Sequence, residues 1–362
     1  MHIPDGFLDA KTAATAAALS AVGAGLALRR VKCELPPRRV PLLGLAAAFL
    51  FAAQMVNFPV LGGTSGHLVG GVLVAALLGP SAAVVVRTTV LIVQCFLFND
   101  GGVLALGANI FNMGIIGGAG GWAIYRVLCG WLPGTRGRVT AIAFAGWAST
   151  VLASICCAGQ LAWSGKVAWP AAFTAMAGVH MLIGVGEGLI SALAFLAIVR
   201  TRPEVIAETP IDLPRWGERT REPVGDPEKR LARTLAPPDR SGRSKSTGYA
   251  EWVGYGLLAT LGIAVFVAPF ACPWPDGLEA VAAKLGFEHQ AAPLRFAPAP
   301  DYQIPGIHWA VAATAIAGAA GSLVVFGLAL LLGRWLVPKQ AVNVCSSRGD
   351  EAQLEGRMKK VE

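Results

Sequence analysis

The second residue of the chain is a histidine, and this position gives it a chemistry that a histidine elsewhere does not have. A chain that begins Met1-His2 offers three nitrogens to one metal ion: the terminal amine, the peptide nitrogen of His2 and Nδ1 of its imidazole. These nitrogens close one five-membered and one six-membered ring, which favours a planar arrangement. Planar nitrogen sites suit Ni(II) and Cu(II), and one position of the plane stays open for a fourth ligand.

The best candidate for this fourth ligand is His67, which ends a glycine-rich stretch over residues 62–67. The whole chain has only five histidines, and imidazole is the commonest side-chain ligand for such metals. The residues alone leave a simpler interpretation open, in which His2 stands at its position by accident and His67 is a solvated loop histidine.

Other polar residues could support such a site or form a pathway through the protein. Glu187 lies near the middle of an apolar segment, where ionisable side chains are costly and often functional, and His180 shares its helix face. The two could relay a metal ion or a proton, or they could form a buried hydrogen-bonded pair that holds helices together. The remaining candidates for support of the site are Asp5, Asn57, Ser65, Asn99, Asn109 and Asn112.

The composition indicates that the elements carrying these residues lie in a membrane. Hydrophobic residues make up 54% of the 362 residues and charged residues only 14%, which is too little charge to cover a soluble domain of this size. The 44 glycines fit closely packed transmembrane helices. The net charge of +8 comes from basic residues between long apolar runs rather than on one polar domain, so we expect no nucleic-acid partner.

The apolar runs predict an all-α polytopic membrane protein, because a helix needs about 20 apolar residues to cross the hydrocarbon core. One long run carries Gly79-Pro80 near its middle, and a turn there divides it into two spans and gives nine in total. The predicted spans are 10–29, 40–57, 68–97 (in two pieces), 108–130, 139–160, 170–199, 250–270 and 307–336.

The flanking charges predict which ends of the spans face the cytoplasm. Basic residues gather around 29–39, around 136–138, over 200–245 and after 334, whereas the connections 58–67, 98–107, 161–169 and 271–306 are poor in them. With nine spans, the N-terminus is expected outside the cytoplasm and the C-terminus inside. The first residues lack the features of a cleaved signal peptide, so we expect the Met1 amine to remain free on the outer side.

This pattern divides the chain into four parts. Residues 1–200 form a seven-span unit that carries the candidate metal ligands. Residues 201–248 form a charged cytoplasmic linker rich in Pro, Arg, Glu and Ser, for which we expect flexibility. Residues 249–337 form a two-span unit with a long outer loop, and residues 338–362 form a cytoplasmic tail that is expected to be disordered.

Three stretches of the chain together resemble the CbiM/NikM family, the substrate-capture (S) components of energy-coupling-factor (ECF) nickel and cobalt transporters. They read MHIPDGFL over 1–8, GGTSGHLVGG over 62–71 and HMLIGVGEG over 180–188. In the C-terminal unit, PDGLE over 275–279 and DYQIPG over 301–306 resemble the PDGLE domain of the small accessory (N) component of the same transporters.

The resemblance implies a function for each part. In this family the metal is bound by the Met1 amine, by the peptide nitrogen and side chain of His2, and by the motif histidine, here His67. The resemblance implies a seven-span S-component bundle that captures Ni²⁺ or Co²⁺ as transported cargo, with no permanently bound cofactor, in the bacterial plasma (inner) membrane. The fused PDGLE unit is expected to promote metal loading, or to act only as a stabilising anchor.

The chain holds no GxxxxGK[ST] phosphate-binding loop and no catalytic constellation, so we expect no enzymatic activity. The resemblance therefore implies two kinds of partner, a transmembrane coupling (T) subunit and cytoplasmic ATPase subunits. The sequence leaves two other functions open: an autonomous secondary transporter or channel for divalent cations, and a membrane metal sensor that does not transport. Planar nitrogen ligation weakly favours nickel over cobalt.

Overall fold

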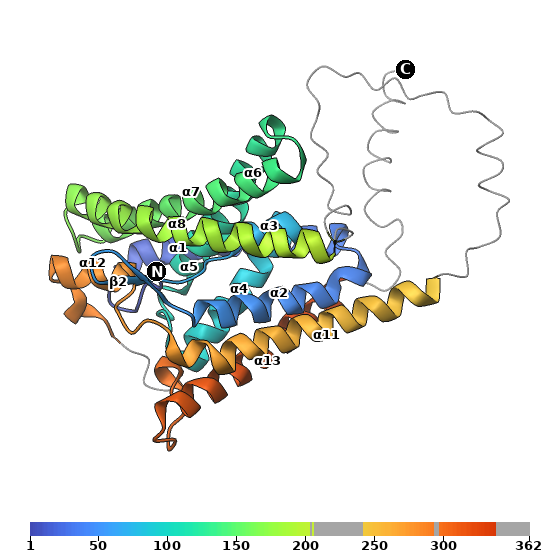
Figure 1. Cartoon of the computed structure of the whole chain (residues 1–362). Coiled ribbons are helices and arrows are strands. Elements are labelled where there is room, and N and C mark those ends of the chain that lie inside the picture. The colour runs from blue at the N-terminus through green and yellow to red at the C-terminus, as the bar shows by residue number, and fades with distance from the viewer. Residues whose placement is uncertain (203–204, 206–241, 293–296, 338–362) are drawn as a thin grey trace, which may run out of the picture.

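The computed structural model describes residues 1–202, 205, 242–292 and 297–337. The predicted linker over 201–248 and the predicted tail over 338–362 lie mostly or wholly outside these residues. Within them the protein is a bundle of long helices, as predicted (Figure 1). The first unit contains α1 (Ala10–Glu34), η1 (Pro37–Arg39), α2 (Val40–Gln54), α3 (Gly71–Leu78), α4 (Pro80–Phe98), α5 (Leu106–Asn109), η2 (Ile110–Gly120), α6 (Gly121–Trp131), α7 (Gly134–Trp163) and α8 (Trp169–Thr201).

The C-terminal unit has two long helices separated by a structured connection. The long helices are α11 (Gly242–Phe266) and α13 (Ala310–Leu336). Between them lie η3 (Ala268–Phe270), α12 (Gly277–Leu285), η4 (Glu288–Gln290) and η5 (Pro300–Tyr302). A small hairpin of β1 (Phe58–Val60) and β2 (Thr64–Gly66), paired antiparallel, interrupts the first unit between α2 and α3.

Six of the described helices are long and apolar enough to cross a membrane, namely α1, α4, α7, α8, α11 and α13. Two further predicted spans are present in shorter or interrupted form. α2 has 15 residues, and the predicted span 108–130 is a continuous helical run in which the middle turns, η2, adopt π-helical hydrogen bonding between α5 and α6. π-helical hydrogen bonding is rare, and where it occurs it is frequently near a functional site.

The predicted span 68–97 is divided at Gly79. This residue has φ 91° and ψ 161°, a conformation open to glycine, so α3 ends at Leu78 and α4 begins at Pro80. At 1.5 Å per residue, the eight residues of α3 span about 12 Å, well short of the roughly 30 Å hydrocarbon core. The described residues thus contain nine helical segments at the predicted places, but the prediction of a full span is wrong for α3, which is a half-length helix.

The two units pack on one another along α2. Both α11 and α13 lie against α2, and α13 also contacts α4 (Figure 1). Gly321 of α13 makes this packing possible, because a Cβ on it would stand 2.2 Å from Cζ of Phe51 on α2. α7 and α8 form the other long antiparallel pair, and Gly188 allows close contact there, since a Cβ on it would meet the Ala143 carbonyl oxygen at 2.3 Å.

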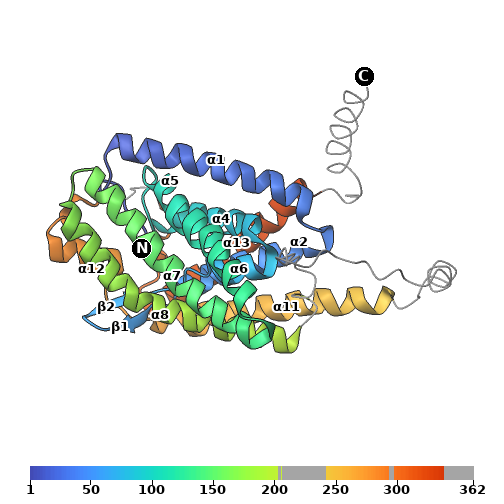
Figure 2. The ribbon, with the colours of Figure 1, turned by 90° about the horizontal axis from the view of Figure 1, so that it is seen from above.

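One end of the bundle collects segments that are far apart in the sequence. The N-terminus, the β-hairpin and α12 lie together at this end in both views (Figures 1 and 2). The connections rich in Lys and Arg, after α1 and before α7, lie at the opposite ends of their helices. The candidate ligands therefore gather at the end of the bundle away from the basic connections.

Candidate metal centre

Hydrogen bonds to the backbone of Ile3 hold the first residues of the chain inside the bundle. Asn109 forms a pair of bonds with Ile3: the Ile3 N–H donates to Oδ1 at 2.8 Å, and Nδ2 donates to the Ile3 carbonyl at 3.1 Å. The Gly102 N–H donates to the same carbonyl at 2.8 Å. Ile3 is completely buried, so this residue fixes the position of the two residues before it.

The loop that carries His67 is fixed from the other side of the site. The β-hairpin precedes this histidine, and the chain then turns into α3 through Gly70, which has φ 67°. Glu187 of α8 accepts hydrogen bonds from the N–H groups of Val69 at 2.6 Å and Gly70 at 2.8 Å. The buried carboxylate therefore satisfies two backbone donors just after His67 and anchors the loop to the bundle.

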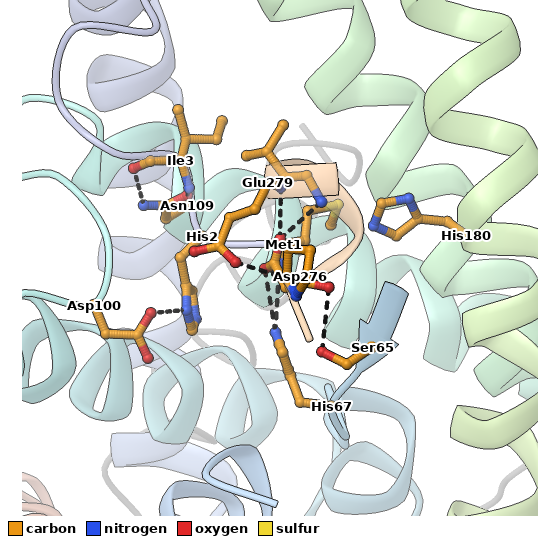
Figure 3. Close-up of polar contacts among 12 residues, drawn as sticks. Met1, His2, Ile3, Ser65, His67, Asp100, Asn109, His180, Asp276 and Glu279 are labelled. Atoms are coloured by element: carbon orange, nitrogen blue, oxygen red, sulfur yellow. Dashed lines mark hydrogen bonds and ion pairs between the residues drawn. The ribbon is translucent and has the colours of Figure 1, made fainter. Parts of the chain in front are cut away.

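The Met1 amine and the two predicted histidines meet in the space between these two supports (Figure 3). The amine nitrogen lies 2.9 Å from Nε2 of His67. The rings of His2 and His67 are stacked, with centroids 5.3 Å apart and an interplanar angle of 17°. Met1 is 5% exposed and His67 7%, so this polar cluster is almost closed to solvent.

The distance between the amine and His67 fits two ligands of one metal ion. Metal ions bind nitrogen ligands at about 2.0 Å, so two nitrogens at adjacent corners of a planar site are about 2.8 Å apart. The observed 2.9 Å, a hydrogen-bond distance in this structure, is close to this separation. Among the described residues, no group of three or more His, Cys, Asp or Glu side chains is placed to hold a metal ion.

His2 does not have its chelating orientation in this structure. Its Nδ1 forms an ion pair with Oδ1 of Asp100, which directly follows the α4 C-cap residue, and its buried Nε2 has no hydrogen-bond partner. Oδ2 of Asp100 accepts a hydrogen bond of 2.5 Å from the hydroxyl of Tyr302, a residue of the C-terminal unit. Asp100 and Tyr302 were not predicted from the sequence, because nothing local to either residue indicates that they reach His2.

The other unpredicted residue is Asp276, the aspartate of the PDGLE stretch. Its Oδ2 accepts a hydrogen bond of 2.5 Å from the Met1 amine and lies 4.0 Å from Nε2 of His67. Asp276 is also the N-cap of α12, in a capping box with Glu279. The S/T/D-x-x-E pattern of a capping box was visible in the sequence, but it predicts a helix start and not the distant amine.

The charges of the site favour a neutral imidazole between carboxylates that stay ionised. Burial, and then the neighbouring amine, lowers the pKa of His67 well below its ordinary value. Burial alone would raise the pKa of Asp276, but the charged Met1 amine beside it outweighs burial and holds the pKa well below the usual range. His2 likewise outweighs burial at Asp100 and lowers its pKa to about 2. A neutral imidazole is the form that binds a metal.

Two of the predicted supporting residues hold backbone close to the site. The Asp5 carboxylate accepts hydrogen bonds from the N–H groups of Val103, Leu104 and Ala105, and so orders the loop that follows Asp100. Oγ of Ser65 donates to the Trp274 carbonyl at 2.8 Å, which joins the hairpin to the PDGLE segment.

The remaining predicted residues lie further from the amine or act through backbone atoms. Nδ1 of His180 bonds to the Met176 carbonyl within its own helix, at 2.8 Å. Asn57 accepts a bond from the Cys272 N–H through its backbone carbonyl, and Asn99 ends α4 in the left-handed conformation. Asn112 exchanges hydrogen bonds with Gln160 of α7.

Comparisons with protein families match the two units separately. Residues 2–205 match the family described as the cobalt uptake substrate-specific transmembrane region, CbiM. Residues 250–338 match the PDGLE domain.

Several relatives have similar sequences over one or both units. The fused nickel transport protein NikMN of Archaeoglobus fulgidus is 34% identical over 339 residues, which is 92% of this chain and 99% of the relative. The fused nickel transport protein NikMN of Rhodobacter capsulatus is 33% identical over 222 residues, which is 57% of this chain and 64% of the relative. The crystal structure of a truncated transition metal transporter, 31% identical, matches 55% of this chain and 99% of its own with a TM-score of 0.51.

Proposed function

The chain belongs to the CbiM family of cobalt-uptake membrane proteins and carries a PDGLE domain, and from this premise we propose that it captures Ni²⁺ or Co²⁺ at its N-terminus for uptake by an ECF-type importer. It is a membrane component of nickel or cobalt transport, and its relatives are named as transport proteins rather than enzymes.

The proposed site is a plane of four nitrogens: the Met1 amine, the peptide nitrogen and Nδ1 of His2, and Nε2 of His67. The observation that carries it is the 2.9 Å between the amine and Nε2, two groups 66 residues apart in sequence that are buried together. Loading requires the His2 ring to turn about its Cβ–Cγ bond, so that Nδ1 leaves Asp100 and faces the amine. Nε2, now without a partner, would then turn toward Asp100, the arrangement of most metal-bound histidines.

The proposed capture side is the extracytoplasmic one, with the N-terminus outside and the C-terminus inside. The basic connections support this orientation, because they lie at the end of the bundle opposite to the site and positive connections remain in the cytoplasm. In a bacterial plasma membrane, the N-terminal amine would then meet metal ions arriving from outside.

The proposed energy source lies in other subunits. The sequence holds no phosphate-binding loop of the GxxxxGK[ST] type, so ATP hydrolysis is assigned to cytoplasmic ATPase subunits coupled through a transmembrane T subunit. The cargo is transported and not kept. Planar nitrogen ligation favours nickel over cobalt by geometry and by the Irving–Williams order.

Nickel titration of the purified full chain tests the site. His67→Ala, and separately a three-residue extension ahead of Met1, should each weaken nickel binding by more than about 100-fold, because loss of a ligand costs more than loss of a residue that only supports one. His289→Ala is the matched control, since His289 is an exposed histidine of η4. Wild-type affinity in either test variant would overturn the proposed site.

A further inference from the structure

The Asp276 carboxylate divides its two oxygens between its own helix and the N-terminus. Oδ1 accepts hydrogen bonds from the N–H groups of Leu278 at 2.7 Å and Glu279 at 2.9 Å, which is the N-cap of α12. Oδ2 accepts the Met1 amine at 2.5 Å. The N-cap hydrogen bonds fix the orientation of the whole carboxylate, so Oδ2 faces the Met1 amine, as Figure 3 shows.

The segment that ends in Asp276 is bound to the hairpin that leads directly into His67. The Ser65 N–H donates to the Pro275 carbonyl at 2.8 Å, and Ser65 and Asp276 form a parallel β-bridge. The hydroxyl of Thr64 donates to the same carbonyl at 3.1 Å. Asp276 and His67 are therefore positioned by one continuous hydrogen-bonded unit, and the Met1 amine lies between them.

The same part of the PDGLE domain closes the site from outside. A Cβ on Gly277 would stand 2.8 Å from Cε1 of His180, so α12 lies directly against α8. The Ala292 N–H donates to the Asp5 carbonyl at 2.8 Å, and a Cβ on Gly6 would overlap the Gln290 carbonyl oxygen. The low exposure of Met1 is thus produced in part by the PDGLE domain, which covers the N-terminal segment.

From these contacts we propose that Asp276 is a positioning residue for metal capture, an inference that rests on the proposed function. Its carboxylate holds the Met1 amine at ligand distance from His67 in the empty site. An amine that binds a metal keeps two N–H groups, so its hydrogen bond to Oδ2 of Asp276 persists in the loaded site. The negative charge of the Asp276 carboxylate then offsets the positive charge of the buried metal ion. Through Asp276 the PDGLE domain contributes directly to the affinity of the site.

Asp276→Asn in the full chain tests this role with nickel(II) alone as the probe. Asparagine is as good an N-cap as aspartate, so α12 keeps its start while the charge beside the amine is lost. Residues that orient metal ligands typically contribute 10- to 100-fold to affinity, and we expect the dissociation constant to rise by about that factor. The nickel absorption spectrum at saturation should remain that of the wild-type complex, because the four nitrogens are unchanged.

Asp9→Asn is the matched control, because Asp9 caps α1 in the same way through the Thr12 N–H and makes no contact with the amine. An equal affinity for the two variants would overturn the proposal. Should Asp276→Asn unfold, Asp276→Ser replaces it, since serine also caps a helix without charge. The two proposals fail separately: normal binding by His67→Ala refutes the metal site, whereas loss of binding by His67→Ala with normal binding by Asp276→Asn refutes only the role of Asp276.

Discussion

The carboxylate of Glu187 in the interior of α8 accepts a 2.6 Å hydrogen bond from the backbone N–H of Val69, and its second oxygen accepts one of 2.8 Å from the next N–H. The two donors follow His67 by two and three residues, and Glu187 is 1% exposed. The sequence left Glu187 open as part of a relay or of a buried pair with His180; in the structure its carboxylate instead binds the loop of a candidate metal ligand, and His180 bonds within its own helix. This contact links the longest helix of the first unit to the site.

Glu187→Gln should weaken nickel binding roughly tenfold and lower the stability of the chain. The amide keeps one acceptor oxygen and turns an N–H₂ group toward a backbone donor, and a buried donor without a partner costs about 1–3 kcal/mol. The loop after His67 then loses its fixed position, and supports of this kind contribute 10-fold or more to affinity. Nickel titration and the midpoint of thermal unfolding in detergent measure the two effects.

Ser191→Ala is the control for that experiment, because its hydroxyl reaches the same carboxylate only at 3.5 Å. We expect this variant to bind nickel as the wild type does. Unchanged affinity in Glu187→Gln would mean that the position of His67 does not depend on the Glu187 carboxylate.

Most of the membrane fold could be predicted from hydropathy, because lipid forces each spanning segment to be apolar over a set length. The half-length α3 could not be predicted in this way. Its residues are as apolar as those of α4, and only Gly79-Pro80 separates the two helices in one long apolar run. Hydropathy measures the solvent around a segment and not whether the segment reaches the other side.

The sequence predicts those residues of the candidate site whose role follows from their own chemistry and position in the chain. It does not predict the residues that reach the site only through the packing of distant segments. Met1 and His2 could be named because their chemistry comes from being first and second in the chain, and His67 because the topology placed its loop on the same side. Asp276 contacts the amine across 275 positions of sequence, through a domain whose docking no local pattern encodes. Whether the three predicted residues bind metal together stays a prediction.

Nickel affinity should fall as the pH is lowered. The terminal amine and the peptide nitrogen of His2 must give up protons to bind a metal, so binding releases protons. Each proton released lowers the affinity about tenfold per pH unit on acidification, and we expect at least this slope between about pH 8 and pH 5. Burial and the amine lower the pKa of His67 well below its ordinary value, so its imidazole stays available over most of this range.

Titration against a competing chelator at each pH measures this slope, with His289→Ala as the reference. A flat profile would show that metal binding releases no proton. Neither the amine nor the peptide nitrogen of His2 could then be a ligand, because each must lose a proton to bind the metal.

Gly102→Ala should damage the site from the side of the loop that follows Asp100. A Cβ on Gly102 would stand 2.2 Å from both the Asp5 backbone nitrogen and its Oδ1, and the Gly102 N–H also bonds to the Ile3 carbonyl. Because the nearest atom is backbone, the N-terminal segment itself must move, and a shift of this kind separates the amine from His67. We expect a loss of nickel affinity of at least about tenfold, comparable to loss of an orienting contact. Gly130→Ala in α6 is the control. Apart from the backbone of its own helix, no atom lies within 4 Å of the Cβ position of Gly130, and alanine favours the helix. Equal nickel affinities for the two alanine variants would show that the amine is not held by the contacts of Gly102.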